Sequence, residues 1–360
     1  MEKKIKINRA LLPLSWLYGA GIWVRNKLFD LKILPSKQFD VPVISVGNIT
    51  VGGTGKTPHI EYLAMLFEGV RKTAVVSRGY KRKTRGFVLA GENSTSLTVG
   101  DEPCQISRKF PDVTVAVDSN RCRAIKRLLA LPDDRRPEVI LLDDAFQHRY
   151  VKPSLSILLE DYNRPVSEDC LLPAGRLREP AENAKRADIK IITKCPADLD
   201  YASQPDSANC FYTKIRYYAL ERALPDENPV LCYCLNDLKN NDFSVMMIAG
   251  LANPEPLKKC LLEYTNDFHS MIYPDHYEYK DRDLFDIMDK FLAINNKKKI
   301  IITTEKDVVR LKNNRFTEYL SFFIYTIPID IEFLNDAMED KFIKIIDEHV
   351  EKFKRNSRLA

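Results

Sequence analysis

A glycine-rich loop between an apolar run and a helical pattern is the segment of this chain best suited to carry chemistry. Residues 47–58 read Gly-Asn-Ile-Thr-Val-Gly-Gly-Thr-Gly-Lys-Thr-Pro and follow the apolar run at 43–46. Glycines let backbone N–H groups converge on phosphate oxygens, Lys56 supplies a positive charge for the β- and γ-phosphates, and the Thr57 hydroxyl can ligate Mg²⁺. The loop therefore predicts a nucleoside triphosphate site. Its predicted nucleotide-binding residues are Thr50, Val51, Gly52, Gly53, Thr54, Gly55, Lys56 and Thr57.

The loop departs from the usual phosphate-binding pattern at one position. The pattern G-x-x-x-x-G-K-[ST] would have glycine at position 50, where this chain has Thr50. Gly52, Gly53 and Gly55 keep the turn flexible. The alternative is a glycine-rich turn that binds nothing, but the order strand, turn, helix favours the phosphate site.

Two adjacent carboxylates follow a second apolar run. Residues 139–142 are continuously apolar and lead into Asp143 and Asp144, with Gln147 three residues further on. Such a run predicts a strand buried on both faces, and P-loop enzymes hold Mg²⁺ through carboxylates at the end of that strand. We predict Asp143 as the metal partner, with Asp144 or Gln147 orienting a ligand or a metal-bound water. The predicted metal site is thus Thr57, Asp143, Asp144 and Gln147, and the alternative is a solvated acidic turn.

Loops rich in arginine lie next to predicted strands. Arg78 follows the apolar run at 73–76, and Arg176 and Arg178 share one short loop. Arginine suits phosphate recognition because its guanidinium donates two parallel hydrogen bonds. Doubly wound sheets bind ligands at the carboxyl ends of their strands, which is where Arg78 is expected. For each loop the alternative is a solvated surface.

The segments that must position these residues alternate between strand and helix patterns. Buried strands are expected at 43–46, 73–76, 113–117, 139–142, 154–160 and 188–193, a basic helix at 120–131, and an extended aromatic stretch at 209–220. This alternation predicts an α/β fold of the P-loop NTPase type, with a doubly wound, mainly parallel sheet.

A smaller C-terminal α/β domain is expected after the linker-like turn at 225–229. Its predicted strands lie at 245–249 and 299–304, and its helices at 256–264, 281–295 and 335–353. We therefore divide the chain into an N-terminal interfacial membrane helix (1–34), a P-loop domain (35–222) and the smaller domain (223–353). The tail from Lys354 is expected to fray.

The N-terminal segment has the features of a membrane-surface helix. An uncharged run of 15 residues at 10–24 follows basic residues and contains both tryptophans, Trp16 and Trp23. It is shorter than the ~20 residues that a spanning helix needs. We predict an amphipathic helix that lies in the interface, with the tryptophans at headgroup depth and basic residues near anionic lipid. The alternative is a terminal helix docked on the core. A membrane surface is therefore a predicted partner, and a lipid a candidate substrate.

Composition favours an enzyme without structural zinc or disulfides. The chain has 360 residues, 45% of them hydrophobic, enough for one large or two modest cores. Its eight cysteines include no C-x-x-C pair and its five histidines no metal-spaced cluster, which predicts a reduced, cytoplasmic chain. Cys232 and Cys234 alternate in an apolar run, as in a buried strand. A net charge of +5 is too small to indicate a nucleic-acid partner.

Taken in order, these motifs resemble the tetraacyldisaccharide 4'-kinases, the lipid A 4'-kinases of Gram-negative bacteria. The resemblance covers nearly the whole chain. It rests on the amphipathic N-terminus, the loop at 47–58, Ser-Arg-Gly-Tyr at 77–80, Gly-Asp-Glu-Pro at 100–103, Asp-Asp-Ala-Phe-Gln-His-Arg at 143–149, Leu-Pro-Ala-Gly-Arg-Leu-Arg-Glu-Pro at 172–180, Gly-Leu-Ala-Asn-Pro at 250–254, Asp-His-Tyr at 275–277 and Thr-Thr-Glu-Lys-Asp at 303–307.

The resemblance implies transfer of the ATP γ-phosphate, with Mg²⁺, to the 4'-hydroxyl of a tetraacyldisaccharide 1-phosphate in lipid A biosynthesis. It implies a peripheral, monotopic enzyme at the cytoplasmic face of the inner membrane. The family's catalytic pair falls on Asp101, which would accept the hydroxyl proton, and His276, which would orient that carboxylate; Lys56 completes the predicted catalytic set. Arg78, Arg176 and Arg178 are the candidates for the substrate 1-phosphate or for transition-state charge.

One departure from the family and two alternative functions remain open at this stage. Ala145 stands where the family pattern has glycine, which questions the local backbone conformation but not the carboxylates. A GTPase regulator would need [NT]-K-x-D; Thr193-Lys194 begins such a segment, but Pro196 occupies the aspartate position. The other alternative is a non-catalytic peripheral membrane protein that only binds nucleotide.

Overall fold

The computed structural model describes residue 5 and residues 7–201, 209–223, 233–251, 253–275, 277–311 and 320–359, with side chains up to residue 355. The chain forms two compact units. The first unit consists of Met1–Asn93, Ile106–Ile215 and Ile331–Ala360, and the second unit of Ser94–Gln105 and Arg216–Asp330. The expected linker at 225–229, Cys232 and His276 lie outside the described residues. The three-part division at residues 34/35 and 222/223 stays a prediction.

Within the described ranges, a nine-stranded sheet runs in the order β14-β8-β7-β6-β1-β5-β2-β4-β3. Its strands are β1 (Val43–Gly47), β2 (Thr73–Ser77), β3 (Val88–Leu89), β4 (Thr114–Val117), β5 (Val139–Asp143), β6 (Leu155–Asp161), β7 (Ile189–Thr193), β8 (Cys210–Tyr217) and β14 (Ile329–Phe333). The strands from β8 to β4 in this order are parallel, and β3 is antiparallel to β4. The predicted α/β class with a mainly parallel sheet is confirmed.

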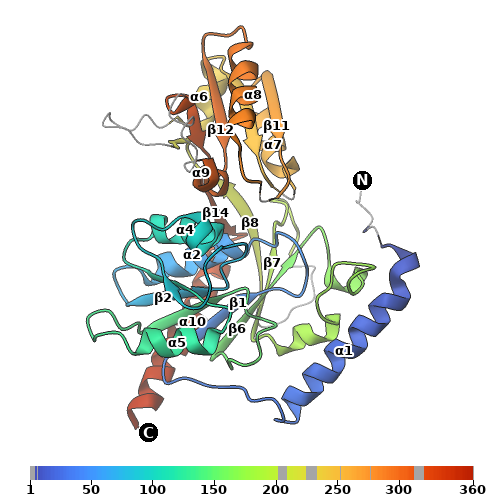
Figure 1. Cartoon of the computed structure of the whole chain (residues 1–360), viewed down its shortest axis with the longest axis vertical. Helices are drawn as coiled ribbons and strands as arrows, with labels where there is room; N and C mark the ends of the chain where they lie inside the picture. Colours follow the sequence, from blue (N-terminus) through green and yellow to red (C-terminus); the bar gives the residue numbers. More distant parts are fainter. Residues whose placement is uncertain are drawn as a thin grey trace. The chain divides into compact units, whose positions relative to one another are not determined.

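Helices cover both faces of this sheet (Figure 1). The helices of the first unit are η1 (Arg9–Leu11), α1 (Leu12–Asp30), α2 (Lys56–Phe67), α5 (Arg121–Leu129), η2 (Val166–Glu168), η3 (Ala181–Arg186) and α10 (Asp336–Leu359), whereas α3 (Ser96–Val99) and the first residues of α4 (Asp101–Lys109) belong to the second unit. Alternate residues of a strand point to opposite faces, so Ile44 of β1 packs with α2 and α10 whereas Val43 packs with α5. The sheet is therefore doubly wound.

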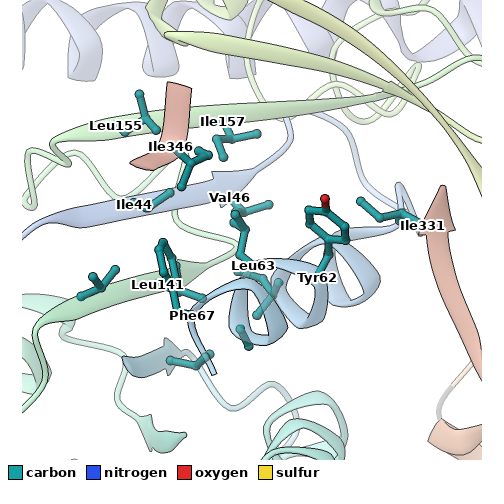
Figure 2. Close-up of a cluster of buried hydrophobic side chains, with 14 of the residues drawn as sticks. Ile44, Val46, Tyr62, Leu63, Phe67, Leu141, Leu155, Ile157, Ile331 and Ile346 are labelled. Carbon is teal, nitrogen blue, oxygen red and sulfur yellow. The ribbon is translucent and has the colours of Figure 1, made fainter. Parts of the chain in front are cut away.

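The core on the α2 face fixes the central strands beneath the phosphate loop. Figure 2 shows Leu63 and Phe67 of α2 against Val46 of β1 and Leu141 of β5, with Ile346 of α10 nearby. Phe67 and Leu63 are each 1% exposed. Burial of a side chain of this size stabilises the fold by roughly 1.5–3 kcal/mol, so α2 is held firmly along the strand that feeds it.

The end of α10 differs from expectation. We predicted fraying from Lys354, but α10 continues to Leu359. Lys354 Nζ lies 2.8 Å from Glu138 Oε1, and Glu351 pairs with Arg71 at 2.6 Å. These two ion pairs join the last turns of α10 to the first unit, which explains why the helix persists past the predicted end.

A second, five-stranded sheet runs through the described part of the chain in the order β11-β10-β12-β13-β9. Its elements are β9 (Glu221–Arg222), α6 (Leu235–Asn240), β10 (Ser244–Ala249), α7 (Glu255–Leu262), β11 (Asp267–Ile272), α8 (Asp281–Leu292), β12 (Lys299–Thr303), α9 (Glu305–Leu311) and β13 (Ile324–Thr326). It is parallel except for β9. The smaller α/β unit is thus confirmed, but the helix predicted for it at 335–353 is α10, which belongs to the first unit. Cys234, however, is exposed at the N-cap of α6 rather than in a buried strand, because the chain turns into that helix.

Candidate functional site

The glycine-rich loop connects β1 to α2, as the sequence predicts. Gly47 ends β1 where a Cβ atom would lie 2.8 Å from Phe146 Cβ, so only glycine fits. Gly55 has φ +84° and caps α2, whose first residue is Lys56. The positive end of the helix dipole and the unpaired N–H groups of its first turn therefore face the loop, an arrangement that binds phosphate.

Buried polar side chains hold the loop in shape. Asn48 is fully buried and donates to Thr54 Oγ1 at 2.8 Å, while Gln147 Nε2 donates to the Asn48 carbonyl oxygen at 2.6 Å. The predicted metal residue Gln147 thus supports the loop through its amide nitrogen. On the other side of the amide, Oε1 accepts from Arg178 at 3.4 Å.

The end of β7 braces the loop from a third direction. Thr193 Oγ1 donates to the Thr54 carbonyl oxygen at 3.0 Å, and Lys194 Nζ donates to the Gly53 carbonyl oxygen and pairs with Asp161. Lys194 has φ +58°, an unusual conformation for a lysine. Thr193 and Lys194, which begin like a guanine-reading segment, therefore hydrogen-bond to the phosphate loop in this chain.

Lys56 and Asp144 form the charged centre of the site. Lys56 Nζ lies 3.7 Å from Asp144 Oδ1, and Arg178 donates to both Asp144 oxygens at 3.0 Å. Burial raises the pKa of the Asp144 carboxyl, but the charges of Lys56 and Arg178 outweigh it and hold the pKa below its ordinary value. The carboxylate is therefore ionised at neutral pH. The positive φ in this turn is at Asp144, +48°, and not at Ala145, so the missing glycine leaves the backbone unstrained at position 145.

Asp143 is held by residues from two neighbouring elements. Its Oδ2 accepts from Ser77 Oγ at 2.9 Å, and its carbonyl oxygen accepts from Arg121 at 3.3 Å. Asp143 is 7% exposed, at the carboxyl end of β5 beside the strand that feeds the loop. Arg78 follows Ser77 on the adjacent β2 and is exposed.

Arg121 and His148 were missed by the sequence analysis. Arg121 is 3% exposed, and its Nε has no hydrogen-bond partner among the described residues. Burial and the nearby arginine charges lower the pKa of His148 to about 4, so the imidazole is neutral at pH 7. The available signals were the arginine that opens the predicted basic helix and the histidine of the segment at 143–149. Arg121 borders the predicted metal carboxylates, and His148 lies near the charges of Arg121, Arg25 and Arg78.

The loop with Arg176 and Arg178 is paired with the chain that enters the phosphate loop. Val51 N donates to the Arg176 carbonyl oxygen at 2.8 Å, and Arg178 N donates to the Ile49 carbonyl oxygen at 2.7 Å. The loop packs so closely that a Cβ on Gly175 would lie 2.2 Å from the Cys170 carbonyl oxygen. This pairing brings two arginines that lie 120 or more residues from Lys56 in the sequence next to the phosphate loop.

Helix α1 buries Ser15, Asn26 and Phe29 and exposes several large apolar side chains, whereas an ordinary surface helix buries its apolar stripe. Ser15 Oγ donates to the Leu171 carbonyl oxygen at 2.9 Å, and Asn26 donates to Glu179 at 3.2 Å. In Figure 1, α1 runs beside the segment that carries these acceptors. Trp16, Leu17 and Trp23 are 71%, 72% and 60% exposed. In the part of the chain that the structure describes, no helix has the length and apolarity to span a bilayer.

A pocket lies between the start of α1 and the arginine loop. Its volume is about 750 Å³, and it is open to the surface. It is lined by Ile7, Asn8, Arg9, Ala10, Pro173, Ala174, Gly175 and Arg176. Of the three predicted substrate arginines, Arg176 is the one that lines this pocket, whereas Arg178 reaches Asp144.

Asp101 belongs to the second unit, where it starts α4. Its Oδ2 accepts two hydrogen bonds from Arg310, at 2.8 and 3.0 Å. Its predicted partner His276 lies outside the described residues. The contacts within the first unit thus bring together Lys56, Asp144, Gln147 and Arg178, and Asp101 lies in a separate cluster built around Arg310.

Comparison with known proteins decides the family. The profile of the family described as Tetraacyldisaccharide-1-P 4'-kinase matches residues 7–351. The chain belongs to this family. A tetraacyldisaccharide 4'-kinase of Bacteroides thetaiotaomicron is 46% identical, over 100% of this chain and 97% of that protein, and one of Flavobacterium johnsoniae is 44% identical, over 91% and 94%.

A solved structure agrees with this assignment. The crystal structure of the "apo" form of LpxK from Aquifex aeolicus in complex with ATP has a TM-score of 0.72 and 30% identity, covering 95% of this chain and 99% of that one. The P-loop kinase fold and the enzyme class predicted from the sequence are thereby confirmed. Membership in the tetraacyldisaccharide-1-P 4'-kinase family decides against both alternatives, the GTPase regulator and the non-catalytic nucleotide-binding protein. The individual site residues stay predictions.

Proposed function

We propose that this chain binds ATP at the loop between β1 and α2 and transfers the γ-phosphate to the 4'-hydroxyl of a tetraacyldisaccharide 1-phosphate. The observation that supports this most is the family match along residues 7–351, which includes every segment of the site. The loop itself offers backbone N–H groups, the α2 N-terminus and Lys56 to a triphosphate.

The transfer needs charge stabilisation and a proton acceptor. Lys56 stabilises negative charge that develops on the β- and γ-phosphate oxygens, and Asp144 keeps the ammonium group aimed at the loop through the 3.7 Å ion pair. The 4'-oxygen forms a bond to the γ-phosphorus while the bond from that phosphorus to the bridging oxygen breaks and ADP leaves. Asp101 accepts the proton that the hydroxyl loses, and His276 orients the Asp101 carboxylate.

The first turn of α2 and the carboxyl end of β5 carry residues that fit Mg²⁺. Thr57, Asp143, Asp144 and Gln147 offer oxygen donors, which this hard cation prefers. Groups of three or more His, Cys, Asp and Glu that could hold a metal are absent from the described residues. In kinases Mg²⁺ is bound by one or two carboxylates, water and the phosphates. When bound, Mg²⁺ neutralises phosphate charge. Asp143 is the better ligand, because Asp144 is engaged by Lys56 and Arg178.

The lipid substrate is proposed to enter beside α1. The open pocket lined by Arg9 and Arg176 has room for a sugar phosphate, and arginine binds phosphate in bidentate fashion. The exposed Trp16, Leu17 and Trp23 would enter the interface of a membrane, where the acyl chains of the substrate lie. Because the phosphate donor is ATP, a cytosolic nucleotide, we place the enzyme peripherally at the cytoplasmic face of the inner membrane.

The test of this function is a transfer assay with the metal controlled. We expect wild-type protein in mixed micelles to convert a tetraacyldisaccharide 1-phosphate to a bisphosphate with ATP and Mg²⁺. EDTA should abolish the reaction and added Mg²⁺ restore it, because phosphate charge must be neutralised for transfer. Undiminished product in EDTA would refute the metal site, and an absence of product with ATP and Mg²⁺ would refute the proposed transfer.

A variant of the exposed face of α1 tests the membrane proposal. We expect replacement of both Trp16 and Trp23 with Ser to weaken binding to phosphatidylglycerol vesicles roughly a hundredfold or more, because each buried aromatic side chain contributes about 1.5–3 kcal/mol. Point variants are preferable to removal of α1, because Ser15 and Asn26 of this helix donate hydrogen bonds to Leu171 and Glu179. Val70→Glu is the matched control: Val70 is 72% exposed but lies after α2. Cosedimentation that is equal for all three proteins would exclude α1 as the anchor.

A further inference from the structure

Three of the segments that carry the family resemblance meet around one arginine of the second unit. Arg310 of α9 is 7% exposed and donates to Asp101 Oδ2 from Nε and from one terminal nitrogen, at 3.0 and 2.8 Å. The other terminal nitrogen donates to Asp307 Oδ1 at 3.1 Å and to the Gly250 carbonyl oxygen at 3.3 Å. Asp101, Gly250 and Asp307 belong to the segments at 100–103, 250–254 and 303–307.

Asp307 holds the terminal nitrogen of Arg310 that does not contact Asp101. It is fully buried, and its Oδ2 accepts from Gly250 N at 3.0 Å and from Thr304 Oγ1 at 2.7 Å. Its Oδ1 accepts from Tyr279 OH at 3.2 Å. Burial and the Asp307 charge raise the pKa of the Tyr279 hydroxyl, which therefore remains a donor at neutral pH. A buried carboxylate with this many donors has little freedom to move.

The backbone of Gly250 leaves room for this arrangement. A Cβ atom there would lie 2.8 Å from Asp307 Oδ1 and 3.0 Å from an Arg310 terminal nitrogen. Any side chain at position 250 would therefore press against both partners of the Arg310–Asp307 ion pair. This gives a physical reason for glycine directly after β10, where the sequence alone indicated only a turn.

We propose that Arg310 is the positioning residue for Asp101 in phosphate transfer, and that Asp307 acts by holding Arg310. The inference rests on the proposed function of Asp101 as proton acceptor. Two N–H donors on one carboxylate oxygen fix the plane and the rotamer of Asp101, and a guanidinium favours its ionised form. Because a proton on Oδ2 would compete with both donors, the hydroxyl proton goes to Oδ1.

Other charged groups around Asp101 must be considered in any titration. Glu102, next to it on α4, pairs with Lys306 of α9 at 2.8 Å, and Lys306 also lies 3.6 Å from Asp275. Asp307 pairs with Arg310 on the side away from Asp101, and Tyr279 donates to Asp307. Arg310 donates two hydrogen bonds to the Asp101 carboxylate, so its removal should raise the pKa of that group.

The direction of the pH effect follows from the charge. Asp101 must be ionised to accept a proton, so kcat falls as the pH drops through the pKa of that carboxyl. Arg310→Gln removes the adjacent cation, which raises this pKa and moves the acid limb of the kcat profile up by about one to three pH units. Arg310→Lys keeps the charge but loses the two-donor geometry. We expect it to lower kcat about tenfold while the acid limb stays near its wild-type position.

A double-mutant cycle of Arg310→Gln and Asp101→Asn in the full chain tests the role of Arg310 separately from the role of Asp101 as proton acceptor. If Arg310 acts through Asp101, Arg310→Gln should lower kcat in the wild-type background but cause little further loss in Asp101→Asn. The positioning role would be overturned if Arg310→Gln lowered kcat by the same factor in both backgrounds, or if its loss of kcat were equal at every pH. Full activity of Asp101→Asn would instead refute the proposed base and leave the phosphate loop assignment untouched.

Two further proteins guard against a folding artefact. Removing one partner of a buried ion pair can destabilise a fold, so thermal melting accompanies each assay and Arg310→Lys supplies a folded variant if Arg310→Gln fails. Lys299→Met is the matched control within the second unit, because Lys299 donates to the carbonyl oxygens of Leu292 and Ile294. Its acid limb should coincide with that of the wild type; a shift as large as that of Arg310→Gln would contradict the inference.

Discussion

Replacement of Lys56 with alanine is expected to lower kcat about 10²–10³-fold or more while the protein stays folded. The ammonium group acts on charge that develops on the phosphates in the transition state, so its loss should reduce turnover more than it reduces nucleotide affinity. The ion pair with Asp144 is 3.7 Å long and partly exposed, and Arg178 remains to pair with the carboxylate. The cost to folding should therefore be about 1 kcal/mol or less.

The matched control for this variant is Lys190→Ala. Lys190 lies in β7 and pairs with Glu160 at 2.7 Å, so the substitution removes a paired lysine from the same unit without touching the loop. Steady-state kinetics with ATP as the varied substrate, together with thermal melting, make the comparison. If Lys56→Ala keeps a kcat within a few-fold of that of Lys190→Ala, the loop is not the site of transfer.

Replacement of Asp101 with asparagine is also expected to lower kcat strongly. Asparagine keeps the size of the side chain and an oxygen for Arg310 but cannot accept a proton, so we expect kcat to fall about 10²–10⁴-fold. The KM for ATP should change little, since Asp101 is assigned to the hydroxyl and not to the nucleotide. Glu102→Gln is the control, because Glu102 is the next residue of α4 and pairs with Lys306. Equal kcat values in the two variants would remove Asp101 from the mechanism.

The fold of the first unit was largely predictable because its central strands are buried on both faces. The apolar runs at 43–46 and 139–142 became β1 and β5, and all five residues of each strand are buried. A continuous apolar run is a strong local signal for such a strand. The phosphate loop was predictable for a related reason: its residues are adjacent in the sequence, so the pattern is local. Strand β11 was missed, because its residues are half-buried or exposed and form no apolar run.

The parts of the site that depend on distant contacts could not be derived from the sequence. Arg178 reaches Asp144 because the loop at 175–178 pairs with residues 49–51, and no local pattern reports that pairing. Arg310 contacts Asp101 across 209 residues of sequence. Arg121 looked like one of several basic residues on a surface helix, yet it is buried against the Asp143 carbonyl group. Side-chain contacts between elements decided each of these cases.

Two local predictions were wrong for identifiable reasons. Cys234 alternates with Cys232 in an apolar run, but Asp237 accepts a hydrogen bond from Cys234 N at 2.8 Å and starts α6 there. The helix-capping contact outweighs the strand pattern. The chain end from Lys354 looked polar and frayed, but ion pairs with the body of the first unit extend α10. In both cases a polar contact determined the local structure.

The most direct test of the account is phosphate transfer by wild type and Asp101→Asn side by side. Both proteins are incubated with ATP, Mg²⁺ and a tetraacyldisaccharide 1-phosphate in mixed micelles, and the attachment point of the new phosphate is assigned by ³¹P–¹H correlation. The account predicts a 4'-phosphate from the wild type and about 10²–10⁴-fold less product from the variant. A phosphate at another hydroxyl, or equal product from both proteins, would contradict it.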